Sequence, residues 1–169
     1  MERIEGLTIV HDFISAEEEA RLIDEINRHE WFSYLQRRVQ HYGYIYDYKT
    51  RKVAPADLSV PEWLGWVIER MISRNLIPVA PNQVIVNEYK SGQGISKHTD
   101  ANVFGEPVIS LSLGENCEMN FLRGNEKVVC ELKRCDLMLL RGESRWNWMH
   151  EILPVKRNGV RISVTFRYV

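Results

Sequence analysis

The C-terminal stretch RISVTFRYV, residues 161–169, carries the clearest fold signal in this sequence. Arg161, Ser163, Thr165 and Arg167 alternate with apolar residues, and successive side chains of a β-strand point to opposite faces. One face of the strand is therefore apolar, and the other carries two guanidinium groups that can bind anions. Taken alone, the pattern also fits an edge strand whose arginines are solvated.

Further β-type runs precede this stretch from residue 83 onward, separated by glycine and asparagine residues. They include VIVNEY, VISLSLG, EMNFLR, EKVVCELK and DLMLLRG, at 84–89, 108–114, 118–123, 126–133 and 136–142. Asn158-Gly159 has the residues that a type I′ turn needs. We therefore expect the final strand to return as a hairpin partner of the segment before it.

Two helices are expected before these strands. Ser15-Ala-Glu-Glu18 is typical of a capping box, and apolar residues at helical spacing follow it. A second helical pattern begins at Pro61 and ends near Asn75. Helices followed by many short strands predict an α+β protein, with a double-stranded β-helix (jelly-roll) core braced by N-terminal helices. We expect a single domain over 1–169.

Composition limits the class of protein. The chain has 169 residues, 44% of them hydrophobic, which suits one core. Its formal net charge of -1 means that binding to nucleic acid requires a local basic patch. Three cysteines without a CxxC pair and no long apolar run predict an intracellular protein, cytoplasmic or nuclear, that is neither secreted nor membrane-bound. We expect a monomer.

His98 and Asp100 form an HxD pair, and His150 follows much later in the chain. Residues two apart share one face of a strand, so both side chains of the pair can meet one ion. Two imidazoles and one carboxylate can bind Fe(II) and leave positions for a co-substrate and dioxygen. An HxD pair alone is usually accidental, but the distal histidine and an arginine suited to a dicarboxylate such as 2-oxoglutarate favour a metal site.

The two arginines of the final strand raise a geometric question. Residues six apart on a straight strand lie about 20 Å apart, too far to grip one small ligand. Either the strand bends or one of Arg161 and Arg167 has another role.

The HxD pair, the distal histidine and the terminal R-x-S-x-T-F-R together resemble the AlkB family of Fe(II)/2-oxoglutarate dioxygenases, over roughly residues 35–169. The resemblance implies that His98, Asp100 and His150 bind Fe(II). It implies that Arg161 pairs with the distal carboxylate of 2-oxoglutarate and that Arg167 lies nearer the keto-acid end. The co-substrate residues implied in full are Asn87, Tyr89, Arg161, Ser163 and Arg167.

Within the family, segments 38–48, 109–114 and 142–152 are similar to the branch that hydroxylates the wobble uridine of tRNA. Asn102 departs from the pattern, because base-repair members carry an acid there that contacts the base. The resemblance implies that dioxygen and 2-oxoglutarate are consumed while a substrate carbon is hydroxylated. The expected substrate is a nucleic-acid base or its modification in RNA or tRNA. The alternatives are N-methyl-base demethylation, a protein or small-molecule hydroxylase, and a binding module without activity.

Residues 35–55 are expected to form a nucleotide-recognition lid. Tyrosines two apart share a strand face on which bases could stack, while basic residues meet phosphates. An enzyme acting on one base must expose it, which favours RNA or a tRNA loop over duplex DNA. The other interpretation is a hairpin whose tyrosines pack on the core. The expected substrate-binding residues are Arg37, Arg38, His41, Tyr42, Tyr44, Tyr46 and Asn102.

Overall fold

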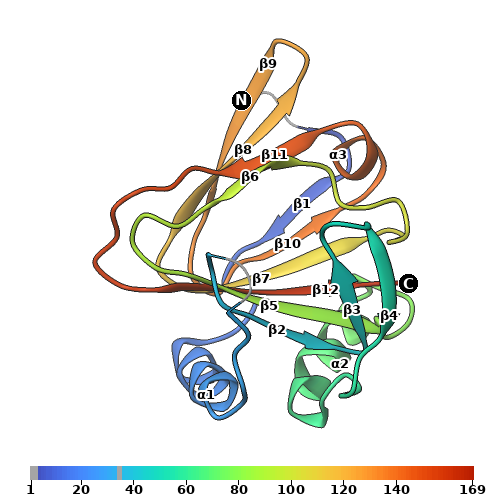
Figure 1. Cartoon of the computed structure of the whole chain (residues 1–169), viewed down its shortest axis with the longest axis vertical. Helices are drawn as coiled ribbons and strands as arrows, with labels where there is room; N and C mark the ends of the chain where they lie inside the picture. Colours follow the sequence, from blue (N-terminus) through green and yellow to red (C-terminus); the bar gives the residue numbers. More distant parts are fainter. Residues whose placement is uncertain (1–3, 34–35) are drawn as a thin grey trace.

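Two antiparallel sheets form the centre of the protein, which the computed structural model describes over residues 4–33 and 36–169 (Figure 1). The larger sheet has the strand order β1 (Leu7–Val10), β10 (Leu137–Leu140), β7 (Val108–Gly114), β12 (Arg161–Arg167), β5 (Gln83–Tyr89) and β2 (Val39–Tyr42). The smaller sheet has the order β6 (Ile95–His98), β11 (Met149–Ile152), β8 (Cys117–Arg123) and β9 (Glu126–Leu132). Strands β3 (Tyr44–Asp47) and β4 (Lys52–Pro55) form a separate hairpin.

Strand β12 lies inside the larger sheet, between β7 and β5. Its apolar residues Ile162, Val164 and Phe166 join one hydrophobic core, while Arg161 and Arg167 are buried on the opposite face. The strand is therefore no edge strand with solvated arginines. The hairpin expected at residues 158–159 is also wrong, because β11 pairs in the smaller sheet and β12 crosses to the larger one.

Helices α1 (Ala16–Asn27) and α2 (Gly65–Ser73) cover the outer face of the larger sheet (Figure 1). Ser15 and Glu18 form the expected capping box at the start of α1. The second helix begins as a 3-10 turn, Glu62–Leu64, before α2. In the described part of the chain, helices are too short and too polar to cross a bilayer.

A second hydrophobic core lies between the two sheets. It contains Phe121 and Trp148 from the side of the smaller sheet and Met138 and Leu140 from β10. The short helix α3 (Gly142–Trp146) connects β10 to β11 and so links the sheets. The predicted jelly-roll core is confirmed, and the facing sheets leave room for a cavity between them.

Candidate metal and co-substrate site

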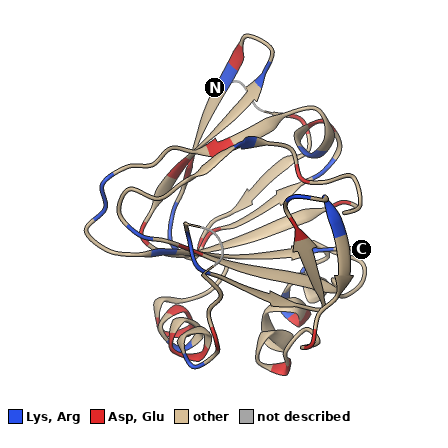
Figure 2. Cartoon of the chain, viewed as in Figure 1, with Lys and Arg blue, Asp and Glu red and all other residues tan. Residues whose placement is uncertain are grey.

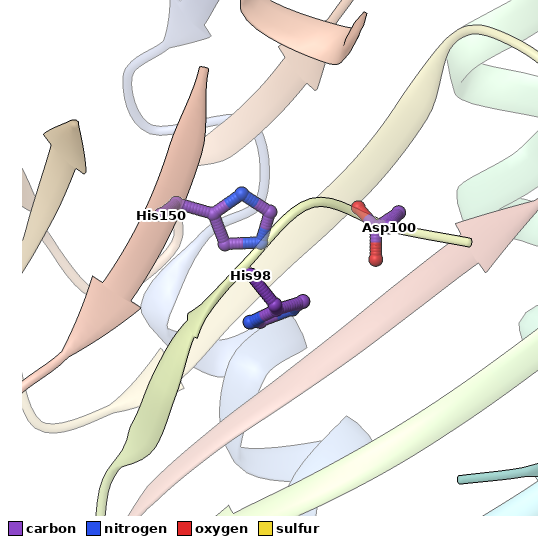
Figure 3. A group of neighbouring side chains, drawn as sticks. All are labelled: His98, Asp100 and His150. Atoms are coloured by element: carbon purple, nitrogen blue, oxygen red, sulfur yellow. The ribbon is translucent and has the colours of Figure 1, made fainter. Parts of the chain in front are cut away.

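His98, Asp100 and His150 come together between the sheets (Figure 3). His98 ends β6, and His150 lies directly opposite it on the neighbouring strand β11. Asp100 follows two residues after His98, just beyond the strand. The potential ligand atoms of the three side chains all lie within 4.8 Å of one another. Ligands at right angles around a transition-metal ion lie about 3 Å apart, so small side-chain rotations would close this group on an ion.

The hydrogen bond of His98 and the pKa values of His150 and Asp100 suit a metal ion. The Nδ1 atom of His98 lies 2.7 Å from the carbonyl oxygen of Ser96, a bond that leaves Nε2 as the ligand atom. Burial lowers the pKa of His150 to about 4, so its imidazole is neutral near pH 7. Burial alone would raise the pKa of Asp100, but electrostatic interactions with His150, Arg167 and His98 outweigh it and hold that pKa below its ordinary value.

Arg161 lies in the same cavity of about 360 Å³, which the triad also lines. Only 1% of Arg161 is exposed, and its Nη2 donates to the Ser112 hydroxyl at 3.0 Å. Among the described residues, its Nε and Nη1 have no hydrogen-bond partner. A buried guanidinium with two unused donors is costly unless an anion completes it. Tyr89 lies opposite Arg161 in the β12–β5 pairing, and Asn87 lies opposite Ser163. All four residues line the cavity.

Arg167 lies at the other end of β12 from Arg161. Its contacts show that the two arginines have different partners. Its Nη1 donates to Asp100 Oδ1 at 3.3 Å, and its Nε donates to Gln83 Oε1 at 2.9 Å. Its Nη2 is buried without a partner in the described part of the chain. Both arginines line one cavity, but Arg167 has the role of pairing with the carboxylate of the metal triad.

The mouth of the cavity carries part of the expected substrate-binding group. Two of the expected substrate-binding residues, Arg37 and Tyr46, line the cavity together with Tyr48, Arg51 and Lys97. Arg37 donates from Nε to Asn87 Oδ1 at 2.9 Å, and its guanidinium lies near the rings of Tyr48 and Tyr89. Arg51 and Lys97 are exposed and Arg37 is half-buried, so these three cationic side chains line the solvent-facing part of the cavity.

The remaining expected substrate residues do not line this cavity. Tyr42 packs in the core beneath the helices and donates its hydroxyl to Gln40, so its expected role in stacking is wrong. Gly43, with φ +78°, turns the chain between β2 and β3 and breaks the row of tyrosines. Arg38 also lies outside the lining, because both carboxylate oxygens of Glu88 accept from its guanidinium. The carbonyl of Tyr44 accepts from Gln83. His41 is buried away from the cavity lining, and Asn102 is exposed.

Sequence reasoning missed Lys97 and Arg145. Lys97 directly precedes the metal-ligand candidate His98 in β6. A single lysine in a sequence does not indicate a binding site. Arg145 is buried in α3 and donates to three backbone carbonyls of residues 100–104. Its contacts depend on the meeting of distant segments, so no local pattern indicates them.

Comparisons with known proteins agree with this geometry. A family model described as the 2OG-Fe(II) oxygenase superfamily matches residues 6–167. Protein L905 of Acanthamoeba polyphaga mimivirus is 32% identical over 98% of this chain and 86% of its own length. The tRNA (carboxymethyluridine(34)-5-O)-methyltransferase alkbh8 of Xenopus tropicalis is 34% identical over 94% of this chain, which spans only 27% of that enzyme.

The fold has a close counterpart among solved structures. The structure of OsALKBH1 superposes with a TM-score of 0.82 over 100% of this chain and 99% of that chain, at 18% identity. The family match extends across nearly the whole chain, and Fe(II) and 2-oxoglutarate are the cofactors that it implies for the His-Asp-His group. The chain thus belongs to the AlkB family within the 2OG-Fe(II) oxygenase superfamily and is an Fe(II)- and 2-oxoglutarate-dependent dioxygenase.

Proposed function

We propose that this dioxygenase oxidises a base, or a modification carried by a base, in RNA, with tRNA as the foremost candidate. The observation that carries the proposal is one continuous cavity lined by the metal triad, by Arg161, and at its mouth by the basic side chains Arg37, Arg51 and Lys97. The frog relative named above is a tRNA-modifying enzyme by its name, which supports the same substrate class.

His98, Asp100 and His150 would hold Fe(II), and Arg161 would pair with the distal carboxylate of 2-oxoglutarate. When bound, these cofactors supply dioxygen activation coupled to the conversion of 2-oxoglutarate to succinate and carbon dioxide. Arg161 would orient the co-substrate, because it lines the cavity and its Nε and Nη1 have no hydrogen-bond partner among the described residues. His98 Nδ1 would keep its proton and donate it to the Ser96 carbonyl oxygen, which leaves Nε2 available for the metal.

The hairpin of β3 and β4, which we call the lid hairpin, would hold the substrate base over the cavity. Tyr46 is buried near the turn of the hairpin, while 38% of Tyr48 is exposed beside it. Their rings meet at 4.9 Å between centroids. Figure 2 shows basic segments on this hairpin. In the sequence, Arg51 directly precedes β4 and Lys52 is its first residue. An aromatic surface beside cationic groups suits an unpaired nucleotide, and base stacking contributes about 1 to 3 kcal/mol per base.

The experiment loads the protein with Fe(II) and 2-oxoglutarate without oxygen, then adds oxygen with total tRNA, single-stranded methylated RNA or duplex DNA. Succinate and the nucleosides are measured by mass spectrometry. We expect succinate formation to rise with RNA and a nucleoside to change in mass. A gain of one oxygen would identify a hydroxylase, and loss of a methyl group would identify a demethylase.

A charge variant separates the substrate surface from the metal site. Arg51→Ala with Lys97→Ala should raise the KM for RNA and leave succinate formation without RNA unchanged, because neither side chain belongs to the triad. Lys127→Ala, an exposed lysine on β9, serves as the matched control. Absence of turnover with every nucleic acid, while a peptide or small molecule is hydroxylated, would contradict the proposal.

A further inference from the structure

Arg145 is a buried cation whose role is not explained by the chemistry described so far. Only 2% of Arg145 is exposed, and its guanidinium lies 3.9 Å from the centre of the Trp146 ring. Its Nη1 donates to the Asp100 carbonyl at 3.1 Å, and its Nη2 donates to the carbonyls of Ala101 and Phe104 at 2.9 and 2.6 Å. Within the described residues it forms no ion pair. Its hydrogen bonds among the described residues therefore all go to backbone oxygens.

The three acceptors belong to one segment, residues 100–104, which has no helix or strand of its own. Such a segment depends on side chains to satisfy its carbonyl groups and hold its shape. Helix α3 also contacts Glu106, two residues beyond the segment, since the Glu106 carboxylate accepts from Trp146 Nε1 at 2.9 Å and from the Gly142 amide at 2.8 Å. The helix thus holds the whole segment that follows His98.

This segment serves the metal group on one side and the lid hairpin on the other. Asp100, its first residue, belongs to the His-Asp-His group. Phe104 and Ala101 pack with Tyr46 of β3 in a small separate core, and Arg167 lies 4.0 Å over the Phe104 ring. A shift of the segment would therefore move a metal-ligand candidate and Tyr46 of the lid hairpin together.

Arg145 also connects the two halves of the metal group. Helix α3 runs directly into β11, which carries His150, while the guanidinium holds the backbone of Asp100. A lysine could not replace it, because an ammonium group presents its donors from one point whereas a guanidinium presents them along a planar fork. If Arg145 positions the segment, lysine should fail to replace it, whereas a residue that only fills space could be replaced by another long side chain.

We propose that Arg145 is a positioning residue that fixes the Asp100 segment relative to His150, and through Phe104 fixes the lid hairpin at Tyr46. The proposal rests on the oxygenase site but not on its substrate. Groups that orient metal ligands in this way typically change metal affinity roughly 10- to 100-fold when they are altered.

The experiment compares Arg145→Lys and Arg145→Met with wild type in the full chain. Binding of Co(II), added alone without 2-oxoglutarate or nucleic acid, is measured by calorimetry, and amide hydrogen exchange is followed over 44–47 and 100–105. Arg70→Lys is the matched control, because Arg70 likewise donates to a backbone carbonyl, of Phe13, and stacks on a tryptophan, Trp66. Urea unfolding is recorded for every variant.

We expect Arg145→Lys to fold, to weaken Co(II) binding roughly 10-fold or more, and to speed exchange in both segments. Arg70→Lys should lower the free energy of unfolding while the Co(II) affinity stays at the wild-type value. An Arg145→Lys variant that fails to fold, or that loses stability but keeps its Co(II) affinity, would show a general structural role and overturn the proposal. Because no nucleic acid is used, failure here is distinct from failure of the proposed substrate.

Discussion

At the scale of single residues, the burial of Arg161 in the cavity indicates most directly which group binds the co-substrate. The side chain is buried in the cavity, and its Ser112 bond leaves two donor nitrogens unused. We predict that Arg161→Met raises the KM for 2-oxoglutarate roughly 30-fold or more, since loss of one partner of a buried charge pair costs about 2 to 5 kcal/mol. Co(II) affinity should not change, because Arg161 is not a metal ligand candidate. Steady-state kinetics with varied 2-oxoglutarate checks the first value, and calorimetry checks the second.

The matched variant for Arg161 is Ser112→Ala, which removes the Ser112 hydroxyl and leaves the guanidinium in place. Its effect on the KM for 2-oxoglutarate should be much smaller. If Arg161→Met kept the wild-type KM, the assignment of the distal carboxylate to this residue would be wrong.

Tyr42 belongs to the hydrophobic core, whereas Tyr46 and Tyr48 line the cavity. Its ring is buried beneath the helices, and its hydroxyl donates to Gln40 Oε1 at 2.9 Å. We predict that Tyr42→Phe lowers the free energy of unfolding by about 1 kcal/mol, the usual value of one such bond, and leaves the KM for RNA unchanged. Urea unfolding and RNA-dependent succinate formation measure the two effects.

Tyr48→Ala is the counterpart for the Tyr42 experiment, because Tyr48 lines the cavity and is partly exposed. Its replacement should raise the KM for RNA with little change in stability. A raised KM for RNA in Tyr42→Phe would contradict the location of the substrate surface.

At this scale, the sequence could predict residues whose role follows from residue type and local spacing, but not residues whose role depends on distant partners. His98, Asp100 and His150 carry their chemistry in residue type and spacing, and the face of Arg161 follows from strand alternation. The placement of Arg38 and Tyr42 depended on distant partners, Glu88 and the helix-side core. Local alternation cannot distinguish a tyrosine facing a core from one facing a ligand.

At the scale of elements, the lid hairpin is set apart from β2 by Gly43. This glycine has φ +78°, and an added Cβ would lie 2.0 Å from the Asn82 carbonyl oxygen. We predict that Gly43→Ala lowers the free energy of unfolding by more than the roughly 1 to 2 kcal/mol of left-handed backbone alone, because the neighbouring backbone must also move. Urea unfolding measures the change.

Gly92→Ala is the control for Gly43→Ala, since Gly92 has φ +79° but no atom within 4 Å of an added Cβ. The difference between the two variants isolates the contact with Asn82. Equal losses of stability in both variants would show that the close approach of β2 and the segment before β5 has no energetic weight.

The elements also show where sequence reasoning reached its limit. The capping box of α1 was confirmed because its bonds join residues three apart, Ser15 and Glu18. The turn expected at Asn158-Gly159 was wrong because strand partners are chosen by the packing of the whole sheet. Strand β12 pairs with β7 and β5, which are remote in sequence.

At the scale of the whole molecule, the metal group joins segments that are far apart in the chain. An ion that binds only the folded protein stabilises it by mass action, by about 2.7 kcal/mol at 100 times the dissociation constant. We predict that Co(II) at 100 times its dissociation constant raises the Tm by roughly 5 to 10 °C for a chain of this size. Thermal unfolding followed by circular dichroism measures the shift.

His98→Ala and His150→Ala should each abolish the Co(II)-dependent rise in Tm. His11→Ala is the control, because His11 pairs with Asp136 instead of contributing to the metal group. A rise of equal size in His150→Ala would mean that the ion binds elsewhere.

The most direct measurement is crystallographic. Crystals grown without oxygen with Mn(II) and 2-oxoglutarate would give an anomalous peak for the metal and density for the co-substrate. We predict one strong peak bound by His98, Asp100 and His150, with the distal carboxylate of 2-oxoglutarate on Arg161. A peak bound by other side chains, or a co-substrate lying away from β12, would contradict the account.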